Sequence, residues 1–115
     1  MADQVTIGAL AASALAMAVA EKEKGDVHGR VDHESLGSSL DQVGCCLTST
    51  GEFGAARPWF ERAVAEKERG NVHGRVDHGS LAQTLRTGAR CLRVLGLVEQ
   101  SRAWDDRASH ITRRD

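Results

Sequence analysis

One stretch of 19 residues occurs twice in this chain. It reads AVAEKEKGDVHGRVDHESL over residues 18–36 and AVAEKERGNVHGRVDHGSL over residues 63–81, so the period is 45 residues. The copies differ only at Lys24/Arg69, Asp26/Asn71 and Glu34/Gly79. A self-match of this length with a fixed period indicates a repeat array, in which each unit buries its apolar face against its neighbours.

Composition indicates a single helical domain over residues 1–115. The apolar fraction of 41% is ordinary for a folded protein, and the chain has 3% aromatic residues, no Tyr and one Pro, which favours helices over sheets. A formal charge of −1 argues against general binding to nucleic acid or anionic membranes. The apolar run 7–20 is too short to span a bilayer and follows no Lys or Arg, so we interpret it as a packed helix.

The hydrophobic pattern predicts about five helices, which cover residues 4–24, 32–50, 52–69, 77–95 and 97–112. Asp32 and Asp77 are placed to cap the second and fourth helices. Pro58 lies inside the third, and Gly54, four residues earlier, offers room for its ring, so we expect a mild kink and an unbroken helix. The predicted organisation is an orphan helix (4–24), repeat 1 (32–69) and a degenerate repeat 2 that caps the stack (77–112).

Repeat 1 also carries a pattern of small and large residues: Leu40, Gly44, Leu47, Gly51, Phe53, Ala56, Phe60 and Ala63. It resembles the tetratricopeptide repeat, whose W-x2-LG-x2-Y motif is followed by Ala, Phe and Ala on the second helix. The segment GEFGAARPWFERAVAEKE is most similar to repeats of the kinesin light chain type, in which an Asp-His pair opens each first helix, as at Asp32-His33 and Asp77-His78. The resemblance implies an all-α, right-handed superhelical array of antiparallel helix hairpins. The period alone also fits HEAT or armadillo units.

Repeat 2 departs from that pattern at three positions. Ala89 replaces the Gly, Ser101 replaces the Ala and Asp105 replaces the aromatic residue, although Trp104 repeats Trp59. A polar residue where the pattern points inward predicts a terminal cap that faces solvent.

The resemblance also implies a binding groove, because the first helix of each hairpin lines the concave surface in this family. The residues expected there are Ser38, Asp41, Gln42, Cys45 and Thr48 from repeat 1, with Gln83, Arg86, Arg90 and Arg93 from repeat 2. The three arginines are spaced four and three residues apart, so they share a helical face that could grip carboxylates. The alternative is a solvated basic face balanced by nearby acids.

Two other groups of residues have side chains of the kinds that bind metals or act as nucleophiles. The duplicated loop supplies His28, Asp32 and His33, then His73, Asp77 and His78, which are good ligand types for Zn or Ni. The capping role of the aspartates and the duplication itself explain these residues without a metal. Cys45, Cys46 and Cys91 form neither an even disulfide set nor a metal motif, and no histidine is spaced to activate them, so we expect reduced thiols in a cytoplasmic chain.

The first helix is expected to pair with a second copy of the chain. Repeat stacks generally need about three units, and this chain supplies two and a half. Small residues at Ala9, Ala12, Ala16 and Ala20 would let a second helix approach closely, which predicts a homodimer. The alternative is a monomer whose first helix is well covered.

Taken together, the sequence predicts a non-catalytic scaffold without a cofactor or metal. The expected ligand is a peptide or protein segment, acidic where it meets the arginines, held in the concave groove. The competing function is self-assembly with no peptide ligand. No nucleic-acid or membrane partner is expected.

Overall fold

The computed structural model describes residues 4–26 and 28–113, and for residues 4–13 and Arg113 it describes the backbone alone. Over these residues the chain forms five α-helices and no strand, which confirms the predicted all-α class. They are α1 (Gln4–Glu23), α2 (His33–Ser49), α3 (Phe53–Arg69), α4 (His78–Val94) and α5 (Val98–Arg113). None of the described helices is long and apolar enough to cross a membrane.

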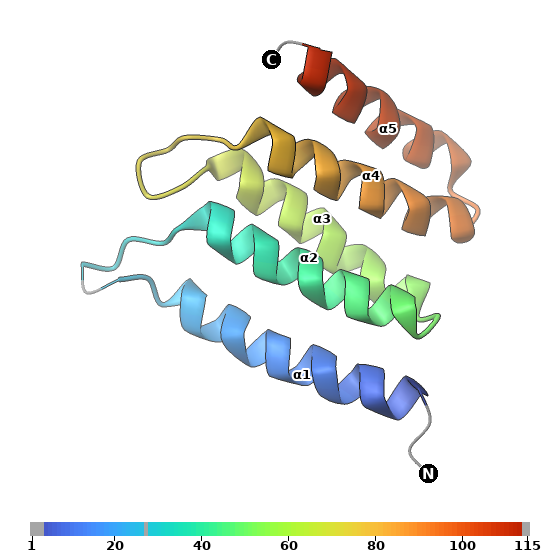
Figure 1. Ribbon diagram of the computed structural model, residues 1–115, viewed down its shortest axis with the longest axis horizontal. Coiled ribbons are helices and arrows are strands. Elements are labelled where there is room, and N and C mark those ends of the chain that lie inside the picture. Colours follow the sequence, from blue (N-terminus) through green and yellow to red (C-terminus); the bar gives the residue numbers. More distant parts are fainter. Residues whose placement is uncertain (1–3, 27, 114–115) are drawn as a thin grey trace.

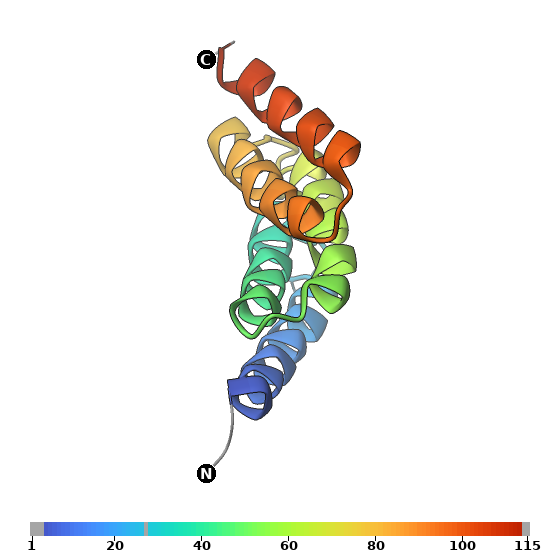
Figure 2. The same cartoon turned by 90° about the vertical axis from the view of Figure 1, so that its right-hand side faces the viewer.

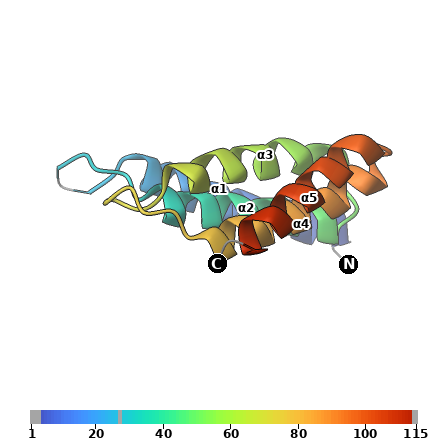
Figure 3. The ribbon, with the colours of Figure 1, turned by 90° about the horizontal axis from the view of Figure 1, so that it is seen from above.

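Each helix packs on the next, so the chain forms a stack with α1 and α5 at opposite ends (Figure 1). Seen edge-on, α2 and α4 lie in one layer and α3 and α5 in the other (Figure 2). The molecule measures 45 × 37 × 16 Å, so it is a slab about two helices thick, which is also clear from above (Figure 3). Both long loops project from one edge of this slab.

Identical caps open α2 and α4, as the duplicated segment predicts. Asp32 Oδ1 accepts a hydrogen bond of 3.0 Å from the Ser35 backbone N–H, and Asp77 Oδ1 does the same with Ser80 at 3.0 Å. Each aspartate satisfies one of the N–H groups that a helix leaves without a partner at its start. The two predicted caps are therefore confirmed.

The two loops also fold alike, because one side chain organises each. Asp26 Oδ1 accepts from the backbone N–H groups of Arg30 (2.9 Å) and His28 (2.8 Å), and Asn71 Oδ1 makes the corresponding bonds in the second loop. The N–H of Arg30 and then that of His28 lower the pKa of the Asp26 carboxyl. Asp and Asn present the same acceptor oxygen, so this difference between the repeats leaves the turn intact.

The core of each hairpin depends on an aromatic ring that lies over a glycine. In repeat 1 the ring of Phe60 packs on Gly44, where an added Cβ would lie 2.8 Å from Cζ of the ring. In repeat 2 a Cβ on Gly88 would lie 2.9 Å from Trp104 Cε3. Both partners in repeat 2 lie one residue before the position that the 45-residue period gives. The contact is therefore retained although Ala89 and Asp105 occupy the expected sites.

Asp105, which the pattern placed inward, lies at the surface of the stack. Its side chain is 39% exposed and accepts a hydrogen bond of 2.8 Å from Arg93. Trp104 takes the place of the missing aromatic residue, so Asp105 has no role in the core.

Helix α3 runs unbroken through Pro58, as expected. The reason is not the one that the sequence indicated. A Cβ on Gly54 would meet no heavy atom within 4 Å, so the missing side chain is not needed to admit the proline ring.

These glycines predict opposite effects of the same substitution. Gly44→Ala and Gly88→Ala each force a methyl group into an aromatic ring and should lower the free energy of unfolding by about 1–3 kcal/mol. Gly54→Ala places its methyl in open space and should raise it by about 0.5–1 kcal/mol, because Ala favours the helix. Urea unfolding followed by circular dichroism measures all three. Equal effects at Gly44 and Gly54 would contradict the ring-on-glycine contacts.

Candidate functional site

The groove residues predicted on α2 differ in their surroundings. Asp41 lies between helices, where its Oδ2 accepts from Thr84 Oγ1 at 2.8 Å and lies 3.7 Å from Lys67 Nζ. Ser38 is half-buried and donates to Glu34 at 3.2 Å. Thr48 is also half-buried, whereas Gln42 and Cys45 are exposed. The structure thus uses Asp41 in helix packing and leaves Gln42 and Cys45 open to solvent.

The groove residues predicted on α4 are all exposed, namely Gln83, Arg86, Arg90 and Arg93. Two of the arginines reach α5: Arg86 donates to Thr112 Oγ1 at 3.4 Å, and Arg93 pairs with Asp105. Arg90 has no carboxylate within ion-pair distance among the described residues. The three side chains therefore share an exposed face, as their spacing predicts, and Arg90 is the one available to a ligand without breaking a contact.

A polar seam between the repeats was not predicted. Lys67 is only 3% exposed, and its Nζ donates to Ser80 Oγ at 2.7 Å and to the Ser80 carbonyl at 3.3 Å. Ser80 Oγ in turn donates to Glu34 Oε2 at 2.9 Å. The sequence offered one signal for this contact, because Lys22 and Ser35 stand one period before Lys67 and Ser80. In the structure Lys22 Nζ donates to the Ser35 carbonyl at 3.3 Å, as Lys67 does to that of Ser80.

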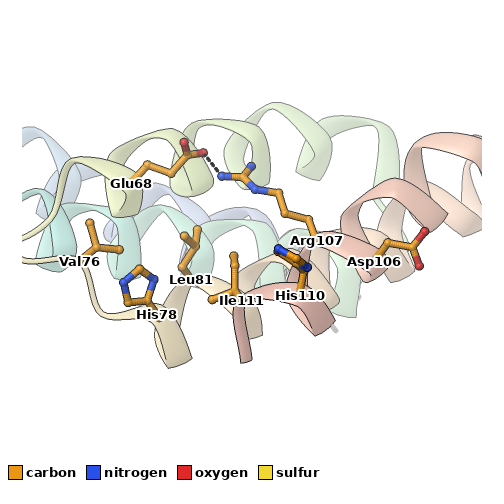
Figure 4. A pocket seen from close by; sticks show the side chains of 8 residues that line it. All are labelled: Glu68, Val76, His78, Leu81, Asp106, Arg107, His110 and Ile111. Carbon is orange, nitrogen blue, oxygen red and sulfur yellow. Dashed lines mark ion pairs between the residues drawn. The ribbon is translucent and has the colours of Figure 1, made fainter. Parts of the chain in front are cut away.

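Two equivalent hollows open beside the duplicated loops. The α3–α5 hollow measures about 620 Å³ and is lined by Glu68, Val76, His78, Leu81, Asp106, Arg107, His110 and Ile111 (Figure 4). The α1–α3 hollow measures about 400 Å³ and is lined by Glu23, Gly29, Val31, His33, Leu36, Arg62, Glu66 and Arg69. Neither hollow was predicted from the sequence, because the walls of each come from three helices and a loop.

The same five residue types frame both hollows at the 45-residue period: Glu23/Glu68, Val31/Val76, His33/His78, Leu36/Leu81 and Arg62/Arg107. In each hollow the arginine forms an ion pair with a glutamate two helices earlier in the chain, and the Arg107–Glu68 distance is 3.0 Å. These pairs connect α1 with α3 and α3 with α5, whose described Cα atoms do not come within 8 Å of each other. The ion pairs therefore bridge helices that are not in backbone contact.

The hollows differ in what faces the histidine. In the α1–α3 hollow, His33 Nδ1 donates to Glu66 Oε2 at 2.5 Å, and both side chains are largely buried. One period later Glu66 is replaced by Ile111, and the His78 imidazole has no hydrogen-bond or ion-pair partner among the described side chains. Figure 4 shows Ile111 between His78 and His110, with Arg107 above them and the Asp106 carboxylate pointing away.

The duplicated histidines and aspartates are not gathered into one cluster. Asp32 and Asp77 cap helices, His33 meets Glu66, and His28 and His73 are exposed on separate loops. Residues 4–26 and 28–113 contain no group of three or more His, Cys, Asp or Glu side chains that could hold a metal ion.

All three cysteines are free thiols. Cys91 is buried, and burial raises the pKa of its thiol. Cys45 is an exposed residue whose sulfur lies 3.4 Å from Asp41 Oδ1, and partial burial of the thiol together with that carboxylate raises its pKa to about 12. Since the thiolate is the reactive species, Cys45 is unsuited to act as a nucleophile at neutral pH.

The predicted dimer residues are only partly visible. The side chains of Ala9 and Ala12 lie outside the described residues. Ala16 is half-buried, Ala20 is exposed, and the neighbouring Met17 is 72% exposed.

No protein-family model matches this chain, and searches of curated proteins and of solved structures also find no match.

The shifted Cys45 thiol predicts slow alkylation with a distinctive pH dependence. In a Cys46→Ala variant, the rate of Cys45 modification by iodoacetamide should rise about tenfold per pH unit from about pH 7 to beyond pH 10, because the thiolate fraction grows until the pKa is reached. The same variant unfolded in urea should level off near the ordinary value of 9.0. Peptide mapping by mass spectrometry gives both profiles. A plateau near pH 9 in the folded protein would contradict the raised pKa of the Cys45 thiol.

Proposed function

We propose that this chain is a non-catalytic interaction module that holds a peptide or protein segment in a groove over α2 and α4. The proposal includes a right-handed superhelical stack of the tetratricopeptide type. It is supported by the two hairpins, by the layer that α2 and α4 form together (Figure 2), and by the glycine-aromatic contact within each hairpin. Three free thiols are consistent with a reducing, cytoplasmic location.

The observation that carries this proposal is the exposed arginine face of α4. Arg86, Arg90 and Arg93 lie on one side of the helix, and Gln42 and Cys45 are exposed on the adjacent helix α2. Guanidinium groups bind carboxylates through two parallel hydrogen bonds, so this face suits an acidic segment. With a net charge of −1, the chain as a whole has no basic excess, so positive character is a local property of its surface.

A second candidate function is self-assembly through α1, which one comparison within the chain favours. Ala18 is exposed, whereas Ala63, one period later on α3, is fully buried against its hairpin partner. Helix α1 thus presents at Ala18 a face whose equivalent on α3 is covered by α2, and this face lies on the side of the helix opposite the predicted Ala16 and Ala20. A second copy of α1 could cover it and give a closed two-fold dimer.

Charge reversal tests the groove. Peptides selected from a random display library on the wild-type protein should be enriched in Asp and Glu. Their affinity for an Arg86→Glu/Arg90→Glu variant should fall at least about tenfold, because each charged hydrogen bond contributes about 1.5–3 kcal/mol. Arg102→Glu, an exposed arginine on α5, is the matched control and should bind normally. Equal losses in both variants, or no acidic enrichment, would argue against the groove.

Solution mass tests the dimer. If α1 pairs with a second copy, light scattering over a concentration series should show a dimer that Ala18→Glu dissociates, because the substitution places a charge in an apolar interface. Ala55→Glu on α3, also at an exposed alanine, should leave the dimer intact. A monomeric wild-type protein at every concentration would exclude this assembly, and the groove proposal does not depend on the result.

A further inference from the structure

We infer that the α3–α5 hollow is a second docking site, which receives an acidic side chain of a partner segment on His78 and an adjacent apolar side chain on its floor. The inference rests on the proposed function of the chain as an interaction module. It concerns a surface other than the groove over α2 and α4, and it assigns the chemistry of the ligand.

The two repeats have diverged unevenly along the chain. Residues 18–36 and 63–81 are identical at 16 of 19 positions, whereas the rest of the period, 37–62 against 82–107, is identical at only 7 of 26. One of those seven is Arg62/Arg107, which completes the frame of the hollow. A duplication alone would leave identities evenly spread, so the frame has been retained while the rest of each hairpin changed.

Packing explains only part of this retention. Leu81 is buried and Val76 is half-buried, so both are needed for the interior, and the Arg107–Glu68 pair connects two helices. His78 is different, because its side chain is exposed and no described side chain bonds to its imidazole. Within the frame, neither packing nor an internal partner accounts for His78, so its imidazole is available to an external partner.

The contact inferred for the ligand already exists within the chain, in the α1–α3 hollow. In the α1–α3 hollow a carboxylate, that of Glu66, accepts a hydrogen bond from the histidine of the same frame. In the α3–α5 hollow Ile111 occupies the Glu66 position, so the carboxylate is missing and the floor is apolar. A ligand that supplies the carboxylate from outside would restore the same contact.

The dimensions and charges of the α3–α5 hollow fit such a ligand. Its volume of about 620 Å³ exceeds that of the α1–α3 hollow, and Val76, Leu81 and Ile111 give it an apolar floor. His78 and His110 provide N–H donors on either side of Ile111. Glu68 is paired with Arg107, and the Asp106 carboxylate points away from His78 and Ile111 (Figure 4).

The test uses two tripeptide probes that differ in one group, N-acetyl-Leu-Glu-Leu-amide and N-acetyl-Leu-Gln-Leu-amide. Titration followed by NMR should produce saturable shifts of the His78 imidazole and the Ile111 methyl signals with the acidic probe. The amide probe should bind at least about tenfold more weakly, because a hydrogen bond to a charged group is stronger than one to a neutral group. The His33 signals should not move, since Glu66 already occupies that position.

Two reciprocal substitutions complete the test. Ile111→Glu supplies the carboxylate internally and should abolish the response of His78 to the acidic probe. Glu66→Ile vacates the other hollow and should add a second site, seen at His33. Far-ultraviolet circular dichroism checks that both variants are folded, and if Ile111→Glu fails to fold, the gain in Glu66→Ile decides alone.

Three results would overturn the inference: no shift at His78 with the acidic probe, equal binding of the two probes, or full retention of binding in folded Ile111→Glu. The Arg90→Glu variant separates this site from the groove, because Arg90 makes no hydrogen bond or ion pair with α5 among the described residues and its replacement should keep the His78 response. If the variant loses library binding but keeps the His78 response, the hollow binds independently of the groove. If library peptides bind through the arginines but the acidic probe gives no response at His78, only the groove proposal stands.

Discussion

The stack depends on the ring of Phe60, which is 1% exposed and lies where the two hairpins meet. Its edge fills the space left by the missing Cβ of Gly44, and a Cβ on Gly88 of the next hairpin would lie 3.3 Å from its own Cβ. One aromatic side chain therefore sets the distance between α2 and α3 and limits the approach of α4. Close-packed interiors tolerate changes of even one methylene poorly, so the spacing of α2, α3 and α4 depends on these glycines.

Apolar packing sets how near the repeats lie, whereas polar contacts specify how they are aligned. Lys67 reaches Ser80, and Asp41 reaches Thr84, from one repeat into the next. The buried ion pair of Lys67 with Asp41 adds little net stability, because desolvation offsets most of its attraction. A misaligned stack would, however, leave these polar groups without partners, which costs free energy. The polar seam therefore favours one register of the helices over the neighbouring ones that apolar side chains alone would accept.

Local features of the structure could be predicted from the sequence, and features that combine several elements could not. The helix ends and the caps at Asp32 and Asp77 depend on residues a few positions apart, so the pattern contains them. The contact of Trp104 with Gly88 escaped prediction because both partners moved by one residue, and the 45-residue register pointed to Ala89 and Asp105 instead. The burial of Lys67 was not predicted, because a lysine near a helix end is typical of a solvated surface.

The same distinction explains where the two repeats have diverged. Within a hairpin a change on one helix can be matched on its partner, as the paired shift of the glycine and the aromatic ring demonstrates. A residue at the junction contacts the hairpin before it and the hairpin after it, so no single partner can compensate for its change. Physical constraint thus preserves those residues of the loop and its flanking turns that contact both hairpins, and the exposed His78 is the exception. The His33–Glu66 contact lies within this preserved junction, and the substitution of Glu66 by Ile111 changed the chemistry of one hollow without disturbing the frame.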